Sequence, residues 1–87
     1  MSNARPERVG EVWTRREGSE TAVYDPARGV LYRLNPSAHA IWELCDGEIS
    51  TEEIVEALVE LTGRLIGDVT AEVESTLDDL RRIGLVI

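Results

Sequence analysis

The spacing of hydrophobic residues in this 87-residue chain changes once, at Asn35–Pro36. Before this point apolar and polar residues alternate, which is typical of strands. After it, apolar residues recur every three or four positions, which indicates amphipathic helices. Asn is a favoured N-cap residue and Pro is favoured at the first helical position, so a helix should begin here. The chain is therefore expected to form its strands first and its helices afterwards.

Three extended segments make up the first part of the chain. The first begins at Val9 and ends at a turn over residues 16–19, and both of its faces are expected to be partly covered. A second, short strand is predicted over residues 21–24. Residues 25–29 contain Pro and Gly, which favour a turn, and residues 30–34 are predicted to be the third strand.

Three helices are predicted next, over residues 35–47, 50–63 and 68–83. Ser50 and Glu53 have the spacing of a capping box at the start of the second helix. Each helix carries an apolar stripe that should face the core. The stripes are Ala38, Ile41, Trp42 and Cys45 in the first helix, Ile54, Ala57, Leu58 and Leu61 in the second, and Val69, Val73, Leu77, Leu80 and Ile83 in the third.

The end of the chain fits the same scheme. Arg81 and Arg82 suit the negative end of the third helix and are expected to pair with Asp78. Gly84 should stop this helix, and the apolar residues 85–87 should fold back on the core. Strands followed by helices predict an α+β fold, in which three helices pack on one side of a three-stranded antiparallel sheet in an arrangement similar to a winged helix-turn-helix.

A chain of this length forms one domain, expected over residues 9–87, with a flexible polar terminus over residues 1–8. Residues 2–4, Ser-Asn-Ala, are typical of a cloning remnant. The first residues have no apolar segment of the kind that a signal peptide needs, and no apolar run is long enough to span a membrane. The single cysteine suits a reducing compartment, so we expect a cytoplasmic protein.

The charge balance excludes some partners. The chain has 17 acidic residues and nine arginines, and its net charge is −8. Proteins bind nucleic acids and anionic membranes largely by neutralising phosphates with Lys and Arg. The predicted third helix would present Glu72, Glu74, Asp78 and Asp79 to such a partner. A winged-helix transcription factor is therefore a disfavoured alternative.

Residues able to do chemistry are sparse. A zinc site needs three or four ligands, and the chain has one histidine, His39, and one cysteine, Cys45. Six positions along a helix would place these two on opposite sides, so they should not form a catalytic pair. Most acidic residues fall at solvent-facing helix positions, and there is no lysine and no glycine-rich phosphate loop. The sequence therefore predicts a protein that is not an enzyme, with no metal and no cofactor.

Peptide binding is the function class that these residues leave open. If the strand over residues 30–34 lies at the edge of the sheet, an extended peptide could pair with it through main-chain hydrogen bonds, and the third helix would form the opposite wall. Val30, Tyr32 and Leu34 share one face of this strand, and Leu31 and Arg33 share the other. The alternative is that the edge is merely short and protected, and that Val73 and Leu77 serve only the core.

Several segments together resemble the PqqD family over roughly residues 9–87. Each of them is weakly specific alone, and their order and spacing carry the resemblance. They are Leu34–Ala38, Ile41–Leu44, Asp46–Gly47, Ser50–Ile54, Asp68–Val69 and Leu80–Leu85.

The resemblance implies a leader-peptide recognition element of ribosomally made, post-translationally modified peptides, with three antiparallel strands followed by three helices. The leader peptide would lie between the third strand and the third helix, antiparallel to the strand, which would contribute mainly backbone groups. The third helix is strongly acidic and would repel an acidic leader, so the leader should be neutral or basic on that side. The implied peptide-binding residues are Val30, Leu31, Tyr32, Arg33 and Leu34 on the strand, and Val69, Glu72, Val73, Thr76, Leu77 and Leu80 on the helix.

The resemblance implies two partners, a precursor peptide and a modifying enzyme or a leader peptidase with its cyclase. The chain is expected to be a stand-alone element, a monomer or a weak dimer through the strand edge. Its short start and its Tyr-Arg-Leu-Asn run are closer to lasso-peptide elements than to the peptide chaperone of pyrroloquinoline quinone synthesis. That chaperone, and a subunit that only stabilises a partner enzyme, remain open alternatives.

Overall fold

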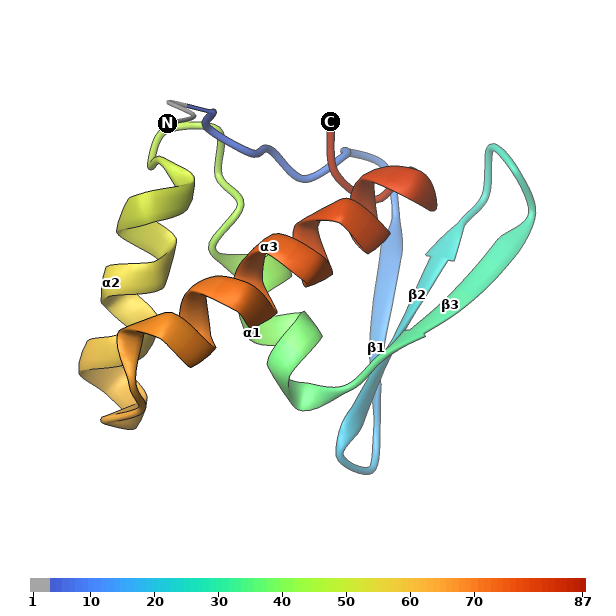
Figure 1. Ribbon diagram of the computed structural model, residues 1–87. Helices are drawn as coiled ribbons and strands as arrows, with labels where there is room; N and C mark the ends of the chain where they lie inside the picture. The colour runs from blue at the N-terminus through green and yellow to red at the C-terminus, as the bar shows by residue number, and fades with distance from the viewer. Residues whose placement is uncertain (1–3) are drawn as a thin grey trace.

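The computed structural model describes residues 4–87 and has three strands followed by three helices, as the change of period predicted (Figure 1). Two residues of the expected cloning remnant, Ser2 and Asn3, lie outside the described residues. The elements are β1 (Trp13–Glu17), β2 (Glu20–Asp25), β3 (Val30–Leu34), α1 (Pro36–Glu43), α2 (Thr51–Thr62) and α3 (Ile66–Arg82).

The strands form one antiparallel sheet in the order β1-β2-β3. The prediction that the first strand begins at Val9 is wrong, because the strand begins at Trp13. The Val9 backbone N–H instead donates to the carbonyl of Leu85 at 3.1 Å, and Glu11 has a positive φ of 57° that breaks the extended run. The predicted turn at residues 16–19 is also too long, since both strands continue until only Gly18 and Ser19 connect them.

Residues 4–8, which were expected to be flexible, pack along the segment between α1 and α2. Pro6 is fully buried, and its carbonyl accepts a hydrogen bond from the Gly47 N–H at 2.9 Å. The Arg8 N–H donates to the Cys45 carbonyl at 2.9 Å, and Ala4 accepts from the N–H of Thr51 at 3.1 Å. These bonds join the start of the chain to the domain.

Helix α1 begins as predicted and ends earlier than predicted. The Asn35 side chain accepts the Ala38 N–H at 2.8 Å, as an N-cap does. The helix stops at Glu43 rather than at Asp46–Gly47. The Asp46 carboxylate accepts the backbone N–H groups of Glu48 and Ile49 at 2.8 and 3.1 Å, a local pattern that competes with helix. These two backbone donors also hold the Asp46 pKa below its ordinary value.

Helix α2 has the predicted capping box. The Glu53 N–H donates to the Ser50 hydroxyl at 3.2 Å, and the Ser50 N–H donates to the Glu53 carboxylate at 2.9 Å. Gly63 ends the helix in the left-handed conformation, at φ 67°. The predicted inner face is partly wrong. Leu61 is 78% exposed because the chain turns away at Gly63, whereas Val55 is buried.

Replacing Ser50 with Ala should destabilise the protein by about 1 kcal/mol, because one helix N–H loses its acceptor. The hydrogen bonds of the capping box lower the Glu53 pKa from its ordinary value of 4.5. A lowered pKa means that the ionised Glu53 carboxylate stabilises the folded protein above pH 4.5, and that this stabilisation is lost as the pH falls through the lowered value. The Ser50 backbone N–H, which is the larger cause of the lowered pKa, remains in S50A, so the Glu53 pKa should rise only part of the way toward 4.5 in an NMR titration, and thermal denaturation across this range should show a slightly weaker acid dependence. An unchanged Glu53 pKa would contradict the coupling.

Helix α3 begins at Ile66, two residues earlier than predicted, with Leu65 as an N-cap that makes no side-chain bond. At its other end the predicted pairing is half right. Arg81 lies 4.0 Å from Asp78, but Arg82 pairs with Asp79 at 2.6 Å.

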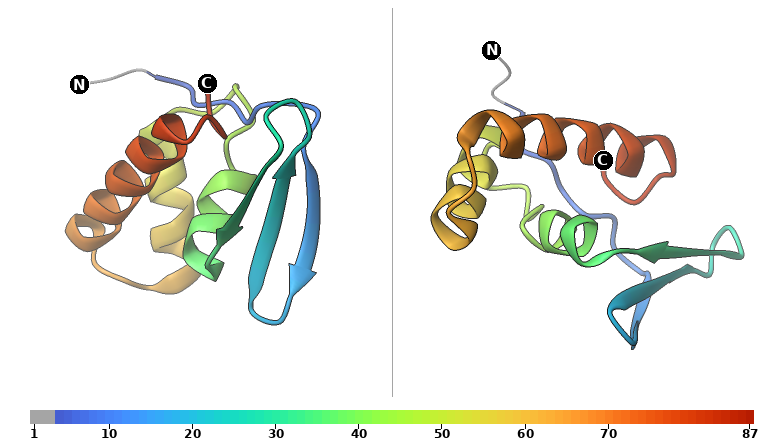
Figure 2. Two further views of the ribbon diagram at one scale, coloured as in Figure 1. Left: turned by 90° about the vertical axis from the view of Figure 1, so that its right-hand side faces the viewer. Right: turned by 60° about the horizontal axis from the view of Figure 1, so that its bottom comes forward.

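The helices all lie to one side of the sheet (Figure 2), where α1 packs on β2 and β3 and α3 packs on α1 and α2, and the core lies between these elements. Its centre includes Trp42, whose indole N–H donates to the Leu85 carbonyl at 3.0 Å. The C-terminal tail folds back as predicted, with Leu85 and Val86 buried and Ile87 exposed. The predicted stripe of α3 is also confirmed, since four of its residues are at most 2% exposed, namely Val69, Val73, Leu77 and Leu80.

Candidate functional site

Strand β3 lies at the edge of the sheet and pairs with β2. Val30 and Tyr32 are half-buried and Leu34 is buried, so this face turns toward the helices. Along an antiparallel edge, alternate residues direct their backbone N–H and C=O groups away from the neighbouring strand. Within residues 4–87, β2 is the one strand that pairs with β3. This edge therefore offers main-chain donors and acceptors to an added strand.

Helix α3 packs against α1, the helix that directly follows β3 in the chain (Figure 1). Its predicted wall residues divide into two groups. Val69, Val73, Leu77 and Leu80 are core residues without accessible surface for a ligand. Glu72 and Thr76 are half-buried on the flank of the helix. A ligand beside α3 would meet this flank, and the four core residues would support it from beneath.

A cavity of about 220 Å³ opens between the first turn of α1 and the N-terminal half of α3. The Arg64 guanidinium at its rim pairs with the Glu72 carboxylate at 3.0 Å. None of the β3 residues lines the cavity. The cavity therefore lies beyond the end of β3, beside the start of α1, and not beneath the strand. Its lining residues are Pro36, Ser37, Ala40, Leu58, Thr62, Arg64, Val69 and Glu72.

Arg28, in the turn between β2 and β3, joins the sheet to the other end of α3. Its Nη2 donates to the Ile83 carbonyl at 3.1 Å, and its Nε donates to the Asp25 carboxylate at 3.2 Å. Asp25 is only 8% exposed and also accepts the Ala27 N–H at 3.0 Å, so the turn is held in one shape. The Arg28 contact fixes the spacing between the β3 end of the hairpin and the C-terminal end of α3.

Gly84 lies directly beneath Arg28, and this predicts a coupled pair of mutations. Gly84 has a φ of 81°, and a Cβ atom there would collide with the Arg28 guanidinium. Replacing Arg28 with Ala should cost about 1–2 kcal/mol because a charge-assisted hydrogen bond is lost. Replacing Gly84 with Ala should cost about 1–2 kcal/mol in backbone strain, plus the displacement of Arg28.

In the double variant R28A/G84A, the cost of displacing Arg28 should disappear, because the guanidinium is already absent. Urea denaturation of the four proteins measures this, and the total should fall short of the sum of the single variants by about 0.5–1.5 kcal/mol. Additive effects would show that Arg28 tolerates the added methyl group without losing its bond.

The structure places the predicted site residues on both sides of the sheet. The side chains of Leu31 and Arg33 are exposed on the outer face, away from α3, so these two residues could serve the edge through their backbone alone. Sequence reasoning missed Arg28, Ala40 and Arg64. Ala40 falls on a helix flank that periodicity could have marked, but nothing in the sequence indicates which distant elements Arg28 and Arg64 approach.

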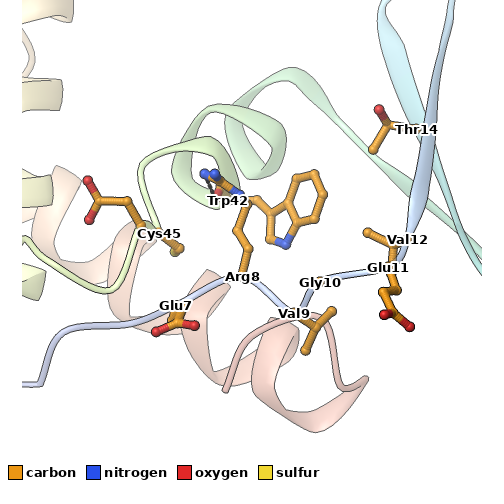
Figure 3. Close-up of a pocket in the computed structure, with 10 residues that line it drawn as sticks. Glu7, Arg8, Val9, Gly10, Glu11, Val12, Thr14, Trp42 and Cys45 are labelled. Carbon is orange, nitrogen blue, oxygen red and sulfur yellow. Dashed lines mark hydrogen bonds between the residues drawn. The ribbon is translucent and has the colours of Figure 1, made fainter.

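A second, more open hollow of about 450 Å³ lies between residues 7–12 and α1 (Figure 3). The Arg8 side chain lies over Trp42, with its guanidinium carbon 5.8 Å from the ring centroid, and it donates to the Glu43 carbonyl. Glu7 and Glu11 point away from the indole (Figure 3). The Arg8 side chain at this hollow thus holds the N-terminal segment to α1.

Cys45 and His39 have separate structural roles. The Cys45 thiol is fully buried and lies 3.2 Å from the Ile41 carbonyl, and burial raises its pKa to about 11. The half-buried His39 ring lies 3.1 Å from the Glu43 carboxylate. In the part of the chain that the structure describes, no three His, Cys, Asp or Glu side chains are grouped as metal ligands would be.

Comparison with known proteins assigns the family. The family profile described as "Coenzyme PQQ synthesis protein D (PqqD)" matches residues 20–86. The chain belongs to the PqqD family. No curated protein matches this PqqD-family chain. Among solved structures it is similar to the one described as "TbiB1 in Complex with the TbiA(beta) Leader Peptide", with a TM-score of 0.77 and 20% sequence identity over 92% of this chain and 93% of the other.

The structural similarity confirms the fold of the PqqD-family chain, a three-stranded antiparallel sheet followed by three helices. The family match confirms the resemblance that the sequence suggested. None of the helices within residues 4–87 has the length and apolar character that crossing a membrane requires.

Proposed function

We propose that this PqqD-family protein binds the leader segment of a ribosomally made precursor peptide by strand addition to β3. The observation that carries the proposal is the edge position of β3 beside α3 and the α1–α3 cavity. The family match and the fold shared with TbiB1, which is described in complex with a leader peptide, support it. The chain would deliver the bound peptide to a modifying or leader-cleaving enzyme.

In this mechanism the leader pairs antiparallel with β3, and its backbone supplies much of the affinity. One apolar side chain of the leader would enter the cavity between α1 and α3, beside the Arg64–Glu72 pair. A segment that becomes ordered on binding loses conformational entropy, so we expect a Kd of about 0.1–10 μM. The proposed contacts are Val30, Leu31, Tyr32, Arg33, Leu34, Glu72 and Thr76, supported from the core by Val69, Val73, Leu77 and Leu80.

The proposed role is not catalytic. Holding the leader near an enzyme raises the local concentration of the precursor and thereby its rate of modification. The acidity of α3 favours leaders that are neutral or basic where they face Glu72. We place this delivery in the cytoplasm, in lasso-peptide synthesis in preference to pyrroloquinoline quinone synthesis.

Titration of the ¹⁵N-labelled protein with the synthetic leader of the precursor encoded beside its gene tests the proposal. The amide signals of residues 30–34, and of the α3 flank at Glu72 and Thr76, should shift, whereas those of β1 should remain in place. A scrambled leader of the same composition is the control and should leave the spectrum unchanged. Absence of shifts at high excess of the correct leader would contradict leader binding and favour a subunit that stabilises a partner enzyme.

A further inference from the structure

A groove of about 400 Å³ runs between α2 and the N-terminal half of α3. Of its lining residues, Val55 is buried and Ile66, at the start of α3, is 62% exposed. The Thr70 hydroxyl donates to the Ile66 carbonyl at 2.7 Å, so its hydrogen is not offered to a ligand. We call the surface formed by Glu52, Val55, Glu56, Ile66, Thr70 and Glu74 the acidic groove.

All the charged residues that line this groove carry carboxylates. They are exposed and form no ion pair within residues 4–87, and they are Glu52, Glu56 and Glu74. The adjoining hollow along α3 is also lined by Glu74, and the arginine that lines it, Arg81, lies 4.0 Å from Asp78. Those two opposite charges offset each other. The acidic groove therefore keeps three uncompensated negative charges around an apolar surface.

The acidic groove and the proposed leader site lie on different flanks of α3. Ile66, Thr70 and Glu74 follow one another at intervals of four residues, which places them on one flank. Glu72 and Thr76 are each offset by two residues from this series, which is about 200° around a helix. A partner in the acidic groove would therefore leave the leader flank free.

The charge of the groove decides which occupant fits. Nucleic acids and anionic membranes would be repelled by the three carboxylates and by the net charge of −8. A second copy of this chain carries the same net charge and has no lysine. Its arginines already contact groups of their own chain. Arg15, Arg28, Arg33, Arg64, Arg81 and Arg82 form ion pairs, Arg8 and Arg16 donate to backbone carbonyls, and Arg5 acts on Glu53.

We propose that the acidic groove docks a helix of the enzyme that receives the peptide, and that this helix carries an apolar side chain flanked by lysine or arginine. This inference rests on the proposed function, because it takes the partner to be that enzyme. The apolar side chain would lie against Val55 and Ile66, as in other complexes of a helix with a groove. Glu52 and Glu56 lie about 6 Å apart along α2, which matches cations four residues apart on the docked helix.

Isothermal titration of the leader-saturated protein with the purified enzyme encoded beside the gene tests the inference. Ile66→Ala should weaken enzyme binding by at least about 10-fold, because it removes the exposed apolar contact. The triple variant E52Q/E56Q/E74Q should weaken it by at least about 10-fold at low salt and much less at high salt, because the lost attraction is electrostatic. Leader affinity should stay within about twofold in both variants, since the substituted residues lie away from the leader flank.

Two matched controls come from α2. Leu61→Ala removes an exposed apolar side chain, and Glu60→Gln removes an exposed carboxylate, and neither residue lines the acidic groove. Both controls should bind the enzyme within about twofold of the parent.

Four results would overturn the inference. They are no enzyme binding by the leader-saturated protein, parental affinity in either groove variant, equal losses in the groove variants and the controls, and a dimer in analytical ultracentrifugation that I66A abolishes. Failure of leader binding is a separate result. If the protein without leader binds the enzyme through Ile66 but binds no leader, the docking surface stands and the proposed function fails.

Discussion

Replacing Val73 with Arg should remove a large part of the protein's free energy of unfolding. Val73 is fully buried at the centre of α3, among the residues that join the sheet to the helices. A buried charge without a partner, together with the overpacking of a larger side chain, should cost at least about 4 kcal/mol. A domain of this length has a free energy of unfolding of about 5–10 kcal/mol, so at most about 6 kcal/mol would remain.

Far-UV circular dichroism during heating measures this effect, and the V73R transition should lie at least about 15 °C below that of the parent. Glu74→Arg is the matched control, because it places the same side chain on the adjacent exposed position and should keep a sharp transition. A cooperative transition for V73R near that of the parent would mean that Val73 is accessible, as the wall of a cleft would be. Loss of peptide binding in V73R alone therefore says nothing about direct contact.

Replacing Thr76 with Arg should weaken leader binding by at least about 30-fold while leaving the melting temperature within a few degrees. Thr76 is half-buried on the flank of α3, so a long side chain there can extend without entering the core. It would occupy the space beside the β3 edge that the proposed peptide needs. A loss of about 2 kcal/mol of binding energy corresponds to this change in affinity.

Isothermal titration with the leader measures the affinity, and Ser75→Arg is the control, because Ser75 is exposed at the next position of the helix. S75R should bind the leader as the parent does. Equal affinity for T76R and the parent would place the peptide elsewhere, whereas equal losses in T76R and S75R would point to a general effect of added positive charge.

The order of elements could be predicted because it depends on local signals. The change of period, the Asn35 cap and the Ser50–Glu53 box each act within one turn of chain, and each is present in the structure. The errors lie where distant segments decide. Val9 reads as strand, yet its N–H bonds to Leu85 near the other end of the chain.

The candidate site was less predictable than the fold. Helical periodicity identifies buried residues, and it therefore pointed to Val73 and Leu77, which are core residues, whereas the accessible flank was implied only by the family resemblance. Whether β3 or β2 forms an edge depends on the strand order, which alternation alone does not determine. The Arg28 contact with Ile83 joins residues 55 positions apart, and no local pattern specifies such a pair.

The alternation of β3 side chains between two faces would also constrain how precursor peptides evolve. A leader paired along this edge adopts the same pleat, so only every second residue turns toward α3 and the cavity. Selection for recognition would then act on those positions alone, and the positions between them could accumulate substitutions. One recognition protein could in this way accept a family of precursors that share a pattern of residues rather than a continuous sequence.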